Sequence, residues 1–97
     1  MDLHNNDIVL SIIIPAYNAE HSIATVIENI SKFIENANIS YEIISVNDGS
    51  SDETLTILQK LEDKFNLSYI SYSHNKGKGY AIRAGVLRSR GQFVLYT

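Results

Sequence analysis

Strand-like and helix-like stretches alternate along the chain, and this alternation restricts the fold more than any other feature. Residues 9–14 and 41–46 are apolar and rich in β-branched side chains, a pattern typical of strands buried on both faces. Residues 67–72 alternate in polarity, and residues 93–97 begin a fourth strand. Strands joined by single helices run parallel, with right-handed crossovers. The order β-α-β-α-β-α-β therefore predicts an α/β fold with a doubly wound, mostly parallel, Rossmann-like sheet.

Helical spacing separates the predicted strands. Ser50 and Glu53 have the spacing of a capping box, which predicts a second helix from Ser50 to about Phe65. A third helix is predicted over residues 80–89, with small residues on the face toward the sheet. The first helix is indicated by apolar residues at helical spacing: Ile23, Val26, Ile27, Ile30, Phe33 and Ile34.

Composition narrows the class of protein. Ninety-seven residues form one domain at most, and the absence of cysteine excludes disulfides and thiolate metal sites. Residues 1–7 lack the basic and apolar order of a signal peptide. The longest apolar stretch, residues 8–16, is too short to span a bilayer. We therefore expect a cytoplasmic location. For the full-length protein, a position at the inner face of the membrane is an alternative.

Charge is distributed unevenly, although the net charge is only −3. All 11 acidic residues lie at or before Asp63. The segment after it carries only basic charges: Lys64, Lys76, Lys78, Arg83, Arg88 and Arg90. Such a segment suggests a local anionic ligand such as a phosphate. For Arg88 and Arg90 a solvated helix face is favoured, whereas Lys76 and Lys78 lie beside glycines that permit close backbone approach.

The loops that follow the first three strands hold most of the unusual residues of the chain. They cover residues 15–21, 47–52 and 74–79. In parallel sheets, ligands bind outside the carboxyl ends of the strands, where the strand order reverses. Neither a G-x-G-x-x-G fingerprint nor a P-loop is present, which argues against a dehydrogenase or a P-loop NTPase. These loops are therefore predicted to form a ligand site of another kind.

Three segments resemble the signatures of one enzyme family. Residues 11–20 read SIIIPAYNAE, residues 46–54 read VNDGSSDET, and residues 75–85 read NKGKGYAIRAG. Together they resemble the family-2 glycosyltransferases of the GT-A fold, and the basic third segment is similar to that of dolichyl- and polyprenyl-phosphate sugar synthases. The resemblance implies that residues 1–97 are the N-terminal nucleotide-sugar-binding part of a GT-A domain, truncated after the fourth strand. Ala19 departs from the synthases, where a glutamate is common.

The resemblance implies roles for individual residues. The carboxylate of Asp48 can accept a hydrogen bond from the N–H edge of a base, with Asn47 as the alternative contact. Pro15 and Tyr17 would pack against the nucleoside, and Lys76 or Lys78 would meet a diphosphate or a lipid phosphate at a helix N-terminus. The structural alternative is a turn that leads into a capped helix. The implied nucleotide-sugar site comprises Pro15, Ala16, Tyr17, Asn18, Asn47, Asp48, Lys76, Gly77 and Lys78.

The groups that would perform the chemistry are expected beyond Thr97. In the family, an Asp-x-Asp motif after the fourth strand binds Mg²⁺ or Mn²⁺, and the general base comes later still. The sequence ends at Leu95-Tyr96-Thr97, where that motif would begin. No catalytic or metal-binding residue is therefore expected in the fragment, which we expect to be inactive alone. Mg²⁺ or Mn²⁺ is expected only for the full-length enzyme.

The leading hypothesis is a glycosyltransferase fragment. Its parent would transfer a sugar, with inversion, from a UDP- or GDP-sugar to an acceptor hydroxyl or a polyprenyl phosphate, in cell-wall or polysaccharide biosynthesis. No nucleic-acid partner is expected, and the exposed sheet edge suggests a homodimer. The alternative is a non-catalytic α/β nucleotide-binding or regulatory module. A receiver would carry an acidic cluster after the first strand, and a nucleotidyltransferase would carry a Gly- and Arg-rich loop there; residues 15–18 offer neither.

Overall fold

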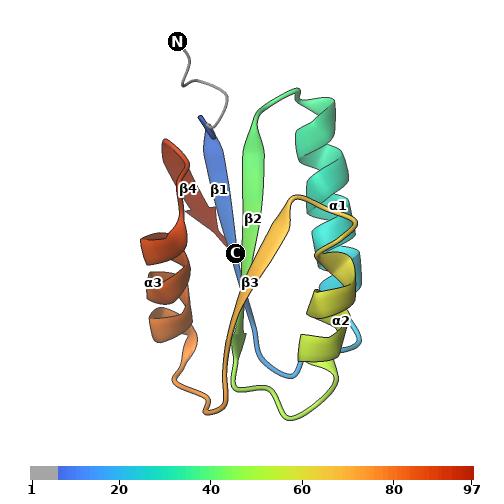
Figure 1. The fold of residues 1–97 in the computed structure, drawn as a ribbon, viewed down its shortest axis with the longest axis vertical. Coiled ribbons are helices and arrows are strands. Elements are labelled where there is room, and N and C mark those ends of the chain that lie inside the picture. The colour runs from blue at the N-terminus through green and yellow to red at the C-terminus, as the bar shows by residue number, and fades with distance from the viewer. Residues whose placement is uncertain (1–6) are drawn as a thin grey trace.

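A single parallel sheet organises the chain in the computed structural model, which describes residues 7–97. The sheet has the order β3-β2-β1-β4, and all three pairs of neighbours are parallel (Figure 1). The strands are β1 (Leu10–Ala16), β2 (Tyr41–Asp48), β3 (Leu67–Tyr72) and β4 (Phe93–Tyr96). The predicted doubly wound α/β fold is thus confirmed, and the strand order reverses between β1 and β4.

Helices cover both faces of this sheet. The helices α1 (Ile23–Asn36) and α2 (Thr54–Leu61) lie on one face, and α3 (Lys78–Arg88) lies on the other (Figure 1). The larger core is buried beneath α1 and α2. The smaller core lies beneath α3, and its buried residues are Ile13, Ile44, Val46 and Ala81. A side chain at Gly85 would collide with Ile13, so the small residues predicted on α3 do permit its close approach to β1.

The central strand β2 is buried along its whole length, yet half of its residues are polar. Burial of a polar group is tolerated only when it is hydrogen-bonded. Each of these side chains has partners: Ser45 Oγ, for example, donates to the carbonyl of Ile14 over 3.0 Å. The others, Glu42, Asn47 and Asp48, bind segments at the two ends of the sheet. These polar residues position the loops around both rims.

The prediction that the second helix starts at Ser50 is wrong. The helix begins at Thr54, and its N-cap residue Glu53 makes no side-chain capping bond. Asp52 caps the helix instead, because its Oδ1 accepts the Thr54 N–H over 2.9 Å. Ser50 Oγ instead accepts the backbone N–H of Asn18 over 2.8 Å, and Ser50 lies four residues before the helix, so it does not serve as its cap.

The other predicted boundaries shift only slightly. The second helix ends at Leu61, four residues before the predicted end, and the third begins at Lys78, two residues earlier than predicted. β2 extends through Asn47 and Asp48, so these two residues belong to the strand rather than to a turn. Across residues 7–97, no helix is long and apolar enough to cross a membrane.

Candidate nucleotide-binding site

A pocket of about 340 Å³ opens at the carboxyl end of the sheet. It takes residues from the ends of β1, β2 and β4 and from the loop between β3 and α3. It lies at the ends of β1 and β4, where the strand order reverses, and this is the switch point at which α/β proteins bind ligands. The lining residues are Pro15, Ala16, Tyr17, Asp48, Asn75, Gly77, Lys78 and Thr97.

The Asp48 carboxylate holds the loop that precedes α3. Its Oδ1 accepts the backbone N–H of Lys76 over 2.8 Å, and its Oδ2 accepts the N–H of Gly77 over 3.0 Å and the side-chain amide of Asn75 over 2.9 Å. A carboxylate offers roughly four lone-pair positions, so three are occupied and one on Oδ1 is free. Asp48 therefore organises the loop and retains an acceptor at the pocket.

Two glycines let the loops approach this carboxylate. Gly49 has a φ of +70°, and a side chain there would collide with the backbone of His74 and Asn75. Gly77 has a φ of +97° and is the N-cap residue of α3, where no side chain caps the helix. The first N–H groups of α3 thus lack a side-chain acceptor, and the positive end of the helix dipole favours an anion there. Both features suit a phosphate beside Lys78.

The two candidate lysines differ in their positions. Lys78 lines the pocket, whereas Lys76 is outside it. The Nζ atom of Lys76 lies 5.2 Å from the centre of the Tyr80 ring, within the range of a cation–π contact. The sequence did not decide whether Lys76 or Lys78 would meet a phosphate. Lys78 is the one of the two that is available to a ligand in the pocket.

Asn47 and Asp48 also differ in whether they face the pocket. Asn47 is buried, donates from Nδ2 to Ser71 Oγ over 3.0 Å and accepts the Ser50 N–H over 3.3 Å. It does not line the pocket. Successive side chains in a strand point to opposite faces, so only one of these neighbours can face the pocket. That residue is Asp48.

Asn18 belongs to a lock between the loops after β1 and β2. Its Oδ1 accepts the N–H of Ser51 over 2.8 Å, and its own N–H donates to Ser50. Further along, Asp52 accepts the N–H of Glu20 over 3.1 Å. Burial alone raises the pKa of Asp52, but hydrogen bonds from Thr54 and the Glu20 N–H outweigh it, and the net shift is downward. The lock joins the loops after β1 and β2, and Asn18 does not line the pocket.

Six of the nine predicted residues thus surround one pocket, and their role as ligand contacts stays a prediction. The three outside it are Asn18, Asn47 and Lys76. Sequence reasoning overlooked Asn75, Thr97 and the neighbouring Tyr72, which pairs with Asp48 in the β2–β3 register. Asn75 directly precedes the Lys-Gly-Lys-Gly run, and that position alone could have indicated it.

Tyr72 has the one aromatic hydroxyl in residues 7–97 that is buried without a hydrogen-bond partner. Its ring meets that of Tyr80 edge-to-face, with the centroids 5.4 Å apart. Burial, followed by the nearby Asp48 carboxylate, raises the pKa of the phenol well above its ordinary value. Tyr72 therefore stays protonated and supplies packing beside Asp48.

The pocket residues do not form a metal site. Across residues 7–97, no group of three His, Asp or Glu side chains could hold a metal ion. Within that described part of the chain, Asp48 is the single carboxylate that lines the pocket, and three protein donors already engage it. Divalent cations such as Mg²⁺ prefer several oxygen ligands.

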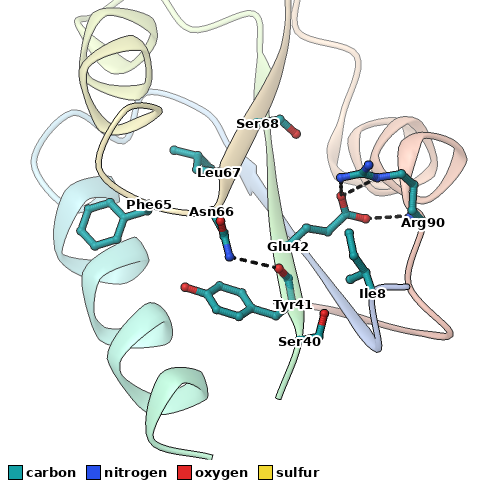
Figure 2. A pocket seen from close by; sticks show the side chains of 9 residues that line it. All are labelled: Ile8, Ser40, Tyr41, Glu42, Phe65, Asn66, Leu67, Ser68 and Arg90. Carbon is teal, nitrogen blue, oxygen red and sulfur yellow. Dashed lines mark hydrogen bonds and ion pairs between the residues drawn. The ribbon is translucent and has the colours of Figure 1, made fainter. Parts of the chain in front are cut away.

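A second hollow, of about 400 Å³, lies at the opposite end of the sheet around Glu42 (Figure 2). The Glu42 Oε2 accepts from Ser11 Oγ at 2.6 Å and from the Arg90 N–H at 2.7 Å. Its Oε1 accepts from the Arg90 guanidinium at 3.3 and 3.4 Å. Burial raises the pKa of Glu42, but these bonds outweigh it and hold the pKa below its ordinary value. All four acceptor positions are used, so the carboxylate joins chain segments and has no position left for a ligand.

Comparison with known proteins identifies the family. The model of glycosyl transferase family 2 matches residues 11–97. The chain belongs to this family. A dolichyl-phosphate beta-glucosyltransferase of Trichomonas vaginalis is 37% identical over 94 residues, which cover 91% of the chain and 29% of the relative. The chain therefore spans less than a third of that relative's length.

Solved structures of glycosyltransferases share the fold. TarS residues 1–349 of S. aureus, solved in complex with UDP-GlcNAc, superpose with a TM-score of 0.80 at 30% identity, covering 93% of the chain and 26% of those TarS residues. A Pyrobaculum calidifontis mannosyltransferase in complex with GDP-Man and Mn²⁺ gives a TM-score of 0.69 at 19% identity, covering 91% and 26%. This second likeness supports the fold alone. The GT-A fold and the family predicted from the three sequence segments are confirmed.

Proposed function

We propose that residues 1–97 form the incomplete N-terminal, nucleotide-sugar-binding part of an inverting glycosyltransferase domain. The whole enzyme would transfer a sugar from a UDP- or GDP-linked donor to an acceptor hydroxyl or a polyprenyl phosphate. The observation that carries this proposal is that Tyr17 after β1, Asp48 at the end of β2 and Lys78 at the start of α3 line one pocket at the switch point of the sheet. The UDP-GlcNAc complex of TarS and the dolichyl-phosphate relatives support the donor and acceptor classes.

Each part of the pocket suits one part of a nucleoside diphosphate. Tyr17 is 54% exposed, and its ring offers a flat apolar surface to a base or ribose. The free Oδ1 position of Asp48 accepts a base N–H, and a hydrogen bond to a charged group contributes about 1.5–3 kcal/mol. Lys78 and the N-terminus of α3 attract the diphosphate. At about 340 Å³, the pocket lies near the lower end of ligand-site volumes, which suits a nucleoside better than a whole nucleotide sugar.

A divalent cation belongs to the proposal for the whole enzyme only. There, Mg²⁺ or Mn²⁺ would stabilise the departing nucleoside diphosphate. Asp48 is a poor ligand because protein donors occupy most of its acceptor positions. We therefore expect the affinity of this chain for UDP to be the same with Mg²⁺ and after its removal by a chelator, as measured by calorimetry. A large gain with Mg²⁺ would show that the pocket supplies ligands after all.

Two further proposals concern assembly and location. The side chains of Phe93, Leu95 and Tyr96 on the edge strand β4 are 57–65% exposed, and such an edge can pair with a second copy. A homodimer through β4 would bury them, and sedimentation of a monomer at high concentration would contradict it. A cytoplasmic location is proposed as well, where nucleotide sugars would reach the pocket; localisation of a tagged full-length protein tests it.

Binding of UDP, GDP and uridine to the 97-residue chain tests the nucleotide site. We expect Asp48→Asn to weaken UDP and uridine alike, because it alters the contact to the base. Lys78→Gln should weaken UDP about tenfold, which corresponds to roughly 1.4 kcal/mol from one charge-assisted contact. It should leave uridine unchanged, because uridine has no phosphate.

Lys60→Gln is the matched control, since it removes the same charge from α2 on the other face of the sheet. Amide chemical shifts measured by NMR would report binding at each loop. If neither nucleotide shifts the amides of Tyr17, Asp48 and Lys78, the non-catalytic module gains support. Equal losses of UDP binding in Lys60→Gln and Lys78→Gln would exclude a specific phosphate contact.

A further inference from the structure

The outward face of α3 is unusual for a solvent-exposed helix. Its inner face packs Ala81 and Gly85 on the sheet. Its outer face nevertheless carries Val86 and Leu87, which are 41% and 77% exposed, and Tyr80, whose ring packs against Tyr72 on one side, is 50% exposed. Exposed apolar side chains grouped on one surface often mark a contact with a partner or a membrane. The outer face of α3 therefore has the character of a contact surface.

Basic side chains frame these apolar residues. Arg83 is exposed on the outer face of α3, Arg88 is exposed at the last residue of the helix, and Lys76 stands over the ring of Tyr80. No acidic residue occurs after Asp63 in the sequence, so no carboxylate on α3 or its flanking loops offsets these charges. Within residues 7–97, Arg83 and Arg88 form no ion pair. The outer face of α3 thus combines exposed apolar side chains with charges that are all positive.

The opposite face of the sheet provides a contrast. There α1 exposes Glu28, Lys32 and Glu35 together, so both signs of charge alternate along the helix. One aromatic residue, Phe33, is as exposed on α1 as Leu87 is on α3, at 74% against 77%. Apolar exposure is thus common to both faces, whereas the charged side chains carried by α3 itself are all positive.

We propose that the outer face of α3 docks on an anionic lipid surface. Interfacial helices insert Leu and aromatic side chains at the headgroup level, while Lys and Arg contact lipid phosphates. Attraction to an anionic leaflet strengthens binding about fivefold for each nearby basic residue. In this orientation α3 lies along the membrane, and its N-terminus with Lys78 stays at the rim of the pocket. The proposal concerns a different surface from the nucleotide site and is independent of nucleotide binding.

Co-sedimentation with vesicles, without nucleotide, tests this docking. The probes are vesicles of phosphatidylcholine alone and vesicles of phosphatidylcholine mixed equally with phosphatidylserine. We expect the 97-residue chain to bind only the anionic vesicles, and added salt to release it. Arg83→Glu should weaken binding roughly 25-fold, since it removes one attraction and adds one repulsion. Leu87→Ser should weaken it about tenfold through lost apolar insertion.

Matched variants on the other face are the controls. Lys60→Glu changes the net charge as Arg83→Glu does, and Phe33→Ser removes a comparably exposed apolar group. Both should bind like the unchanged chain, with circular dichroism showing that all four variants are folded. Equal binding to neutral vesicles, or equal losses in Lys60→Glu and Arg83→Glu, would overturn the proposal. Tighter binding to RNA than to anionic vesicles would also overturn it, in favour of a general polyanion surface.

Discussion

The two ends of strand β2 each bury a carboxylate, and the two carboxylates are used differently. At the amino end, Glu42 receives four hydrogen bonds from Ser11 and Arg90. At the carboxyl end, Asp48 receives three from the loop between β3 and α3. A carboxylate with all acceptors occupied joins parts of the chain, whereas one with a free acceptor beside a pocket can also bind a ligand. Of these two pockets, the larger lies at the amino end, so volume alone would have pointed to that end as the ligand site.

The two carboxylates also differ in the distance along the chain that they bridge. Glu42 binds Arg90, which is 48 residues away, and so fixes the connection from α3 to β4 across the sheet. Asp48 binds a loop 27 to 29 residues away that carries the pocket residues Asn75, Gly77 and Lys78. The amino end therefore stabilises the fold, and the carboxyl end shapes the site that the fold presents.

The largest expected effect on stability comes from replacing a closely packed glycine at each end of the sheet, Gly49 at the carboxyl end and Gly91 at the amino end. Gly49→Ala forces a side chain into a left-handed conformation and against the backbone of Asn75. We expect a loss of about 3 kcal/mol in the free energy of unfolding, from backbone strain and overpacking together. Gly91→Ala places its methyl 2.6 Å from the Ser11 amide nitrogen but needs no unusual backbone, so we expect about 2 kcal/mol.

Urea unfolding measures both losses, and amide chemical shifts locate them. Gly49→Ala should perturb the loop from His74 to Gly77, and Gly91→Ala should perturb Ser11 and Arg90. A smaller loss for Gly49→Ala than for Gly91→Ala would mean that the pocket loops yield more easily than the close contact at Gly49 suggests.

Glu42→Gln should lower stability at neutral pH by about 2 kcal/mol, because it replaces hydrogen bonds to a charged acceptor. The sign of the pH effect follows from the lowered pKa of Glu42. The folded state binds this proton more weakly than the unfolded state, so the stability is present above the ordinary pKa of 4.5 and is lost as the pH falls through the lower folded value.

Urea midpoints measured from neutral pH down through this acid range check the prediction. The unchanged chain should lose more stability on acidification than Glu42→Gln, so the difference between them narrows. UDP binding at neutral pH should be equal in both, since Glu42 lies at the opposite end of the sheet from the pocket. Parallel acid profiles, or weaker UDP binding in the variant, would contradict the assignment of Glu42 to fold stability alone.

The sheet and its rim were predictable because they follow from local patterns. The β-branched segments and the helical spacing of Ile23, Ile27 and Ile34 determine which faces are buried, and parallel connections bring the three loops together. The sequence could also have predicted which of Asn47 and Asp48 faces the pocket, because side chains alternate along a strand. Ile44 and Val46 pack toward α3, and Asp48 continues their two-residue alternation, whereas Asn47 has the opposite parity.

The lock between the first two loops was beyond local reasoning. Ser50 and Glu53 do have the spacing of a capping box. The Ser50 hydroxyl, however, accepts a hydrogen bond from the backbone N–H of Asn18, 32 residues earlier. Asn18 itself adopts a left-handed conformation with a φ of +50°, which asparagine tolerates well. Contacts between residues so far apart in the chain depend on the sheet register, and the sequence pattern does not specify them.

The smallest expected effect compares two tyrosine hydroxyls. Tyr72 lies near the carboxyl end, and its buried hydroxyl has no partner within residues 7–97. Tyr41, at the amino end, donates to Glu35 over 3.0 Å. Removing an unsatisfied buried hydroxyl relieves a desolvation penalty, so Tyr72→Phe should leave stability unchanged or raise it by up to about 1 kcal/mol. Tyr41→Phe should lower stability by about 1 kcal/mol through the lost hydrogen bond.

Thermal and urea unfolding of the two variants, each differing from the parent by one oxygen atom, would measure this contrast. A clear loss of stability in Tyr72→Phe would mean that the hydroxyl does have a partner in solution, and the Asp48 carboxylate, which already influences the phenol, is the acceptor to test. Tyr72 would then occupy the free acceptor position of Asp48, and the base contact proposed for that position would lose its acceptor. The smallest effect thus bears directly on the difference between the two ends, since it measures whether Asp48 is as saturated as Glu42.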